Sequence, residues 1–244
     1  MKKLPKKEKE KMPVFTFNEV KRIYKNKKSQ SNSDFSFVSD IFEEIRKKYI
    51  EKARKQGKDA NQSWNAWSGK NFQKLISFII TDFISSTSWD VGVTDDNALR
   101  HNLLEEEFDK VRRNIVVFYG QYDIVPDADI VIYDKKCCKI IAILSCKASL
   151  RERIAQAAYW KVKLQSSIVT KHVLCYLISL DRDGDFFNKG EDISRNRIIV
   201  EFGELDGAYI LNDIPESNKI KHFNKIFNDL DDILRKWFAT NEAE

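Results

Sequence analysis

The sequence predicts one α/β domain with a mixed central β-sheet flanked by helices. Two β-branched apolar runs, residues 130–133 and 139–145, flank a short polar turn, which is typical of an antiparallel β-hairpin. A continuous apolar run at 171–179 predicts a strand buried on both faces. Segments with apolar residues at helical spacing alternate with these strands, and such alternation is typical of α/β domains.

The chain before the hairpin is expected to be mainly helical. Residues 1–34 are rich in lysine and end in a polar tract, so we expect a basic, flexible N-terminal arm with at most one short helix around 17–24. The remaining residues, 35–244, are expected to form the single domain. Apolar spacing and β-branched runs then predict helices at 37–50, 63–80 and 99–113, followed by a strand at 114–119.

Beyond the hairpin, a helix is expected to run to about Leu164, before the strand at 171–179. Apolar runs at 197–202 and 205–211 predict two further strands. The apolar stripe at 220–238 predicts a C-terminal helix that covers the core or contacts a second copy of the chain.

Composition limits the class of protein. The net charge of +5 over 244 residues permits a polyanionic partner without requiring one. The four cysteines include no CxxC pair, which favours reduced thiols. The N-terminus is lysine-rich and no apolar run approaches the length of a membrane span. We therefore expect a cytoplasmic protein with no membrane association.

The hairpin brings candidate catalytic residues toward one of its ends. Because side chains alternate between faces along a strand, Asp127 and Asp129 share one face, as do Ser145 and Lys147. If the register brings these faces together, two carboxylates, a hydroxyl and an ammonium group converge. A carboxylate pair beside a lysine suits a hard cation and a phosphate, so both aspartates are candidate Mg²⁺ ligands. The sequence does not decide which of them is the principal ligand.

At these residues the chain resembles a known family. Pro126-Asp127 followed by Ser145-Cys146-Lys147 resembles the PD-(D/E)xK nuclease signature, with serine at the second acidic position. This serine variant, followed at once by Arg151-Glu152-Arg153, is similar to restriction endonucleases that recognise a CCGG or CC(N)GG core. The run SCKASLRERIAQAAYWKVKL at 145–164 most resembles BsaWI-type type II restriction endonucleases, and the resemblance spans about residues 63–211. It implies a restriction-endonuclease-like fold. It also implies Mg²⁺-dependent hydrolysis of phosphodiester bonds in double-stranded DNA, at a palindromic site with a CCGG-type core.

The resemblance further implies roles for single residues. Lys147 would orient or deprotonate the attacking water, or stabilise charge on the phosphate. Ser145 would hydrogen-bond to water or phosphate. Arg151, Glu152 and Arg153 would read C·G pairs, because an arginine fork matches guanine O6 and N7 and a carboxylate accepts from cytosine N4. Two copies of this segment, related by the two-fold axis of a homodimer, would cover a palindrome. A cognate DNA methyltransferase and a bacterial or archaeal source are also implied.

Carboxylates are missing at positions where the family pattern has them. Ser145 stands at the second acidic position, and Gln73 stands where related nucleases carry a metal-binding glutamate. Some CCGG-reading relatives have a glutamate later in the following helix, where this chain has Gln156 and Trp160. A compensating acid could be one of Glu105, Glu106 and Glu107, or none of them. These glutamates also fit a solvated helix face, with Glu106 paired to Lys110.

The missing charge leaves an alternative from another functional class. The chain could be a catalytically weak or inactive sequence-specific DNA-binding protein of nuclease ancestry. A third possibility is a repair or mobile-element nuclease that has the same fold but does not recognise CCGG.

Overall fold

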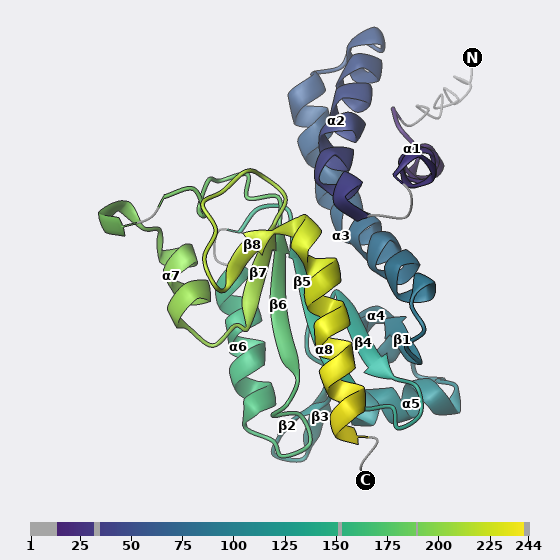
Figure 1. Ribbon diagram of the computed structural model, residues 1–244, viewed down its shortest axis with the longest axis vertical. Helices are drawn as coiled ribbons and strands as arrows, with labels where there is room; N and C mark the ends of the chain where they lie inside the picture. Colours follow the sequence, from purple (N-terminus) through teal and green to yellow (C-terminus); the bar gives the residue numbers. More distant parts are fainter. Residues whose placement is uncertain (1–13, 32–34, 151–152, 189, 242–244) are drawn as a thin grey trace, which may run out of the picture.

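A computed structural model describes residues 14–31, 35–150, 153–188 and 190–241. Within these residues the chain forms one mixed six-stranded sheet in the order β1-β4-β5-β6-β7-β8, and a separate hairpin of β2 and β3 (Figure 1). The strands of the sheet are β1 (Val91–Thr94), β4 (Ile130–Asp134), β5 (Ile140–Lys147), β6 (Leu174–Ser179), β7 (Gly207–Ile210) and β8 (Ile220–His222). The small hairpin consists of β2 (Val117–Tyr119) and β3 (Tyr122–Ile124). The predicted α/β architecture with a mixed central sheet is confirmed.

The predicted central hairpin is formed by β4 and β5, which pair antiparallel with Ile130 opposite Leu144. Strands β5 to β8 run parallel to one another, and Lys147 at the end of β5 pairs with Ser179 at the end of β6. Because parallel strands end at the same edge of a sheet, the carboxyl ends of β5, β6 and β7 lie together there. The residues that lead into the antiparallel strand β4 reach the same edge.

Helices cover both faces of the sheet (Figure 1). Along β4, Ile130 and Ile132 enter one hydrophobic cluster and Val131 and Tyr133 enter the other, as the alternation of side chains requires. The first cluster includes residues of α1 (Phe17–Gln30), α2 (Val38–Lys55), α3 (Ala60–Ser86) and α8 (Ile226–Asn241). The second includes residues of α4 (Asp96–Leu99), α5 (Glu106–Arg113), α6 (Arg153–Gln165) and α7 (Arg195–Phe202). Short 3₁₀ helices occur at Phe35–Phe37, Gly190–Asp192 and Phe223–Lys225.

Helix α1 occupies much of the segment expected to be an arm, and it is longer than the short helix predicted there. The Thr16 side chain caps it by accepting from the Glu19 backbone N–H, while the Glu19 carboxylate accepts from the Thr16 N–H. Val20 and Tyr24 are fully buried, and the Tyr24 hydroxyl donates to Asp82 of α3 at 2.8 Å. Residues 1–13 and 32–34 lie outside the described residues, and the domain boundary at residue 34 stays a prediction.

The strand predicted at 197–202 is wrong, because the chain forms helix α7 there. Ser194 caps this helix by accepting from the Arg197 N–H at 3.0 Å, and the Arg197 guanidinium pairs with Glu201 one turn later at 3.1 Å. The run of β-branched residues that suggested a strand is divided between environments, since Val200 is buried and Ile198 is exposed. Capping and burial of the arginine therefore outweigh the local β propensity.

Three other segments differ from the sequence expectations. The helix predicted at 99–113 is two helices, α4 and α5. The segment before it, for which no element was predicted, contains strand β1. The helix predicted from residue 220 begins with strand β8. In the described part of the chain, no helix is long and apolar enough to span a membrane.

Candidate active site

The end of β5 and the segment before β4 bring a carboxylate and an ammonium group together. The Lys147 Nζ lies 2.7 Å from Oδ2 of Asp129, although the two residues are 18 positions apart. The backbone N–H of Cys146 donates to the same carboxylate oxygen, also at 2.7 Å. Strand β4 begins at Ile130, so Asp127 and Asp129 lie in the irregular segment before it, and they do not share one face of a strand as expected.

The pair of Asp129 and Lys147 lines a cavity of about 530 Å³. The exposed fractions of the two side chains are only 18% and 16%, so each charge is held in a partly desolvated position with its counter-charge in contact. Helix α3, the end of β5, the start of α6 and the loop after β6 form the walls of the cavity. The site is therefore concave, charged and open to a ligand.

Asp127 has a different environment from Asp129. Its Oδ1 accepts from Arg100 Nη2 at 2.7 Å, and its Oδ2 accepts from the amide of Gln156. Its side chain is 41% exposed. Both carboxylate oxygens of Asp127 are thus occupied by hydrogen-bond donors. On Asp129, the donors within the described residues bind one oxygen, Oδ2.

Asp96 and Arg100 belong to this cluster, although the sequence analysis did not single them out. Arg100 Nη1 lies 2.8 Å from Oδ2 of Asp96, so one guanidinium bridges Asp96 and Asp127. The Asp96 N–H donates to the Ala128 carbonyl at 3.0 Å, which attaches α4 to the segment carrying the predicted acids. Burial raises the pKa of Asp96, Arg100 opposes this, and Asp129 and Asp127 raise it further. A third carboxylate therefore lies within electrostatic range of the two predicted ones.

Nothing in the local sequence distinguishes Asp96 from its neighbour Asp95. The Asp95 side chain accepts from the Ala98 N–H at 2.8 Å, so Asp95 is an ordinary N-cap residue and Asp96 is the first residue of the helix. Only the hydrogen bond from the Asp96 N–H to the Ala128 carbonyl shows that Asp96 also lies near the predicted acids.

Comparisons with known proteins identify the family of this chain. Residues 107–230 match the family described as BsaWI restriction endonuclease type 2. The chain is also 40% identical over 219 residues to MjaVIP of Methanocaldococcus jannaschii, named as a candidate type II restriction enzyme, with 83% of this chain and 96% of that protein covered. The chain belongs to the BsaWI restriction endonuclease family. The predicted BsaWI-type family and the predicted enzyme class, a type II site-specific deoxyribonuclease, are confirmed.

One further relative and one similar solved structure were found. HpyAORF263P of Helicobacter pylori, named as a probable type II restriction enzyme, is 36% identical over 126 residues, covering 52% of this chain and 64% of that protein. Among solved structures, the PspGI restriction endonuclease in complex with substrate DNA aligns with a TM-score of 0.46 and 12% identity, covering 89% of this chain and 93% of that one.

Two glutamines line the cavity at positions where related nucleases carry carboxylates. Gln73 and Gln156 both line the cavity. The Gln73 side-chain amide donates to the Asp129 backbone carbonyl at 3.2 Å. Trp160, the other position considered for a compensating acid, packs against the second hydrophobic cluster. These contacts place polar but uncharged groups around Asp129.

The motif residues Ser145 and Cys146 differ in their relation to the cavity. Ser145 is buried and is not among the described residues that line the cavity. Cys146 does line it, but burial raises the pKa of its thiol well above the ordinary value, and Asp129 adds to this effect. The Cys146 thiol therefore stays neutral and is not an activated nucleophile.

The three glutamates considered as compensating acids, Glu105, Glu106 and Glu107, lie outside the cavity in the described structure. Glu106 pairs with Lys110 at 2.6 Å, which confirms the predicted pair on a solvated helix face. Glu107 accepts a hydrogen bond from the Tyr133 hydroxyl at 2.7 Å, and Tyr133 lies near the opposite end of β4 from Asp129. Glu105 precedes α5 at its N-cap position.

The predicted base-reading segment leads into α6. Arg153 is the first residue of this helix, is exposed, and lines the same cavity as Asp129 and Lys147. Arg151 and Glu152 lie outside the described residues. One of the three predicted base-reading residues is thus placed beside the candidate active site.

Proposed function

We propose that this chain is a Mg²⁺-dependent type II restriction endonuclease that cleaves double-stranded DNA at a palindromic site with a CCGG-type core. The observation that carries the proposal is the contact between Lys147 and Asp129 inside a charged cavity, with Arg153 on its rim. Phosphodiester hydrolysis needs a nucleophilic water and stabilisation of charge on the phosphate, and these residues can supply both.

In this proposal Lys147 orients or deprotonates the attacking water and Asp129 is the principal metal ligand. Asp127 is less suited to that role because Arg100 and Gln156 occupy both of its carboxylate oxygens. Asp129 has Oδ1 available within the described structure, while Cys146 and Lys147 fix its orientation through Oδ2. Ser145 would act through a hydrogen bond to water or phosphate.

The residues present fit a hard divalent cation. The described residues do not gather three or more histidine, cysteine, aspartate or glutamate side chains into a metal-binding cluster. Mg²⁺ does not require one, because it commonly takes one or two carboxylates and keeps waters and substrate phosphate oxygens as its other ligands. When bound, the ion supplies charge stabilisation at the phosphate. The Asp129 carboxylate and the amide oxygens of Gln73 and Gln156 are oxygen donors of the appropriate kind.

Incubation with plasmid DNA tests the activity directly. With Mg²⁺ we expect discrete fragments, and without a divalent ion we expect intact plasmid that is retarded on a gel. Intact but retarded plasmid in both arms would favour the alternative, a sequence-specific DNA-binding protein that lacks catalysis. The replacement of acids by Ser145 and Gln73 is the observation that favours this alternative.

The specificity assignment has its own test. In a homodimer, two Arg151-Glu152-Arg153 segments would read the two halves of a palindrome, and each lost bidentate contact costs about 1–3 kcal/mol of discrimination. We expect Arg153→Ala to lose affinity for CCGG-containing duplexes and to retain it for scrambled duplexes in competition binding at one salt concentration. Equal losses for both duplexes would make Arg153 an electrostatic contact only. Sedimentation of the DNA complex would determine whether two copies bind, and a neighbouring DNA methyltransferase gene would support the proposed restriction system.

A further inference from the structure

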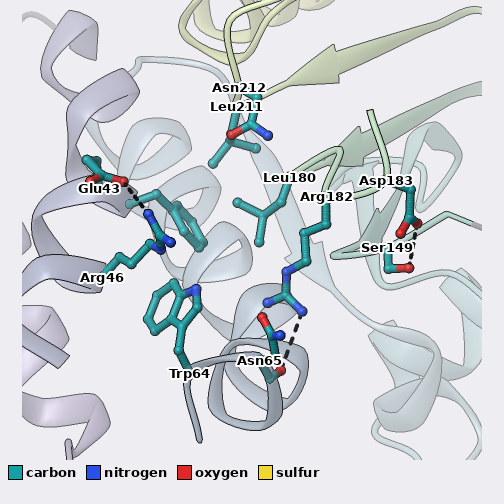
Figure 2. A pocket seen from close by; sticks show the side chains of 11 residues that line it. Glu43, Arg46, Trp64, Asn65, Ser149, Leu180, Arg182, Asp183, Leu211 and Asn212 are labelled. Atoms are coloured by element: carbon teal, nitrogen blue, oxygen red, sulfur yellow. Dashed lines mark hydrogen bonds and ion pairs between the residues drawn. The ribbon is translucent and has the colours of Figure 1, made fainter. Parts of the chain in front are cut away.

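Arg182 lies at the same edge of the sheet as the candidate active site. Ser179, at the end of β6, is the register partner of Lys147, and Arg182 follows it by three residues. Arg182 lines the cavity that contains Asp129 and Lys147, and it also lines a neighbouring cavity of about 670 Å³. Figure 2 shows its side chain extending into this second cavity toward Asn65. It therefore stands at the junction of the two spaces.

The polar partners of the Arg182 guanidinium are uncharged. Its Nη1 donates to the Asn65 carbonyl at 3.5 Å, and its Nη2 donates to the Ser68 hydroxyl. Within the described residues no carboxylate lies within ion-pair distance of this guanidinium. The adjacent Asp183 instead accepts a hydrogen bond from the Ser149 hydroxyl at 2.7 Å (Figure 2). It also accepts from the Leu150 N–H at 3.3 Å.

A half-buried cation with neutral partners is energetically unfavourable unless an anion joins it. Burial lowers the pKa of Arg182, and the charge of Asp183 only partly opposes this. Three other charged groups line the second cavity. Arg46 and Glu43 pair with each other at 3.6 Å, and the Asp183 carboxylate accepts from Ser149 and Leu150 instead of pairing with Arg182. In the first cavity Lys147 pairs with Asp129 at 2.7 Å. Arg182 therefore keeps a positive charge directed at space that a ligand can fill.

The loop that carries Arg182 is held in a fixed conformation. Asp181 has a left-handed backbone with φ of 48°, which is uncommon for a residue other than glycine. Its buried carboxylate accepts from the backbone N–H groups of Asp185 at 2.8 Å and Phe186 at 3.0 Å. The Asn212 side-chain amide donates to the Asp181 carbonyl at 3.1 Å. Strained backbone conformations that are held by several hydrogen bonds cluster at functional sites, where they fix the orientation of a side chain.

We propose that Arg182 binds a phosphate group of the substrate DNA strand next to the phosphate that is hydrolysed, and that the strand continues through the second cavity. The inference rests on the proposed function of Asp129 and Lys147 for the position of the reacting phosphate. A guanidinium fork matches phosphate oxygens in a bidentate geometry, and its preset direction reduces the entropy lost on binding. Arg182 would thereby fix the register of the strand in the active site.

Salt dependence of DNA binding tests this without cleavage. We would measure duplex affinity in the absence of divalent ions at several salt concentrations for wild type, Arg182→Gln and Arg182→Lys. Each phosphate contact contributes about 0.9 to the slope of log K against log salt. We expect Arg182→Gln to reduce the slope by about 0.9 and Arg182→Lys to retain it. The matched control is Arg235→Gln, which removes the same charge from an exposed ion pair on α8; its slope should equal that of wild type.

A wild-type slope for Arg182→Gln would overturn the proposal, and so would an equal reduction for Arg235→Gln. If Arg182→Gln does not fold, the wild-type protein can be treated with phenylglyoxal, with and without duplex, and modification of Arg182 located by peptide mass spectrometry. Protection by duplex supports the proposal, and equal modification contradicts it. Neither the salt slope nor the protection from phenylglyoxal depends on catalysis. A wrong assignment of Asp129 and Lys147 would therefore appear in the cleavage assays and leave these two results unchanged.

Discussion

The ammonium group of Lys147 and the backbone N–H of Cys146 contact the same oxygen of Asp129, each at 2.7 Å. This arrangement results from the antiparallel pairing of β4 and β5, which brings the start of one strand beside the end of the other. It orients the carboxylate through one oxygen and leaves the second available. The following predictions depend on this geometry and on the packing around it.

Lys147→Ala should lower the single-turnover cleavage rate by about 100-fold or more and leave specific DNA binding largely intact. The reason is that a residue acting on the attacking water contributes to the reaction step, typically by ~10²–10⁴-fold, and little to ground-state binding. Cleavage and gel-shift assays on the same duplex provide the measurement. Lys55→Ala is a suitable control, because Lys55 forms an exposed pair with Glu51 on α2. Undiminished cleavage by the Lys147 variant would be incompatible with the proposed site.

Asp129→Asn should reduce cleavage far more than Asp127→Asn. Asp129 contacts Lys147 and receives its hydrogen bonds from the described residues on one carboxylate oxygen, whereas both oxygens of Asp127 are bound by Arg100 and Gln156. Single-turnover rates measured over a range of Mg²⁺ concentrations separate a loss of metal binding from a loss of the reaction step. A larger effect at Asp127 would assign the principal metal ligand to that residue instead.

Arg197→Ala should destabilise the fold by about 3–5 kcal/mol, as expected when one partner of a buried charged network is removed. The Arg197 side chain is fully buried and donates to the carbonyls of Phe186 and Pro215, the latter at 2.8 Å, as well as to Glu201. Its removal leaves those acceptors unsatisfied. Urea unfolding measures the change, with Arg235→Ala as the control, for which we expect about 0.5 kcal/mol or less. Equal stability of the two variants would contradict this account of α7.

Glu19→Gln should lower the melting temperature at neutral pH but not in strong acid. A hydrogen bond from Lys52 and the Thr16 backbone N–H lower the pKa of Glu19 below its ordinary value of 4.5, against the opposing effect of burial. A carboxyl group whose pKa is lower in the folded state stabilises the protein above its unfolded-state pKa, and this contribution is lost as the pH falls through the folded-state value. Melting temperatures of both proteins from pH 7 to well below 4.5 provide the test. A difference that persists unchanged in acid would mean that the side chain acts through packing instead.

The sequence alone determined those strands and motifs that can be recognised from neighbouring residues. The β-branched runs around the turn predicted the pairing of β4 with β5, and the apolar run at 171–179 predicted the buried strand β6. The motif Ser145-Cys146-Lys147, with its charged continuation, identified the family. These features could be predicted because the apolar pattern of a strand and the order of residues in a motif lie within one short stretch of chain.

Only the tertiary structure decided how distant residues combine. The burial of Arg197 and the cap by Ser194 make a helix from a segment with β propensity. The contact of α4 with residue 128 places Asp96 near the predicted acids, and the parallel pairing of β5 with β6 places Arg182 at the active-site cavity. In each case the deciding interaction joins residues that are distant in the sequence. Their hydrogen bonds and charge interactions therefore form only when the chain is folded.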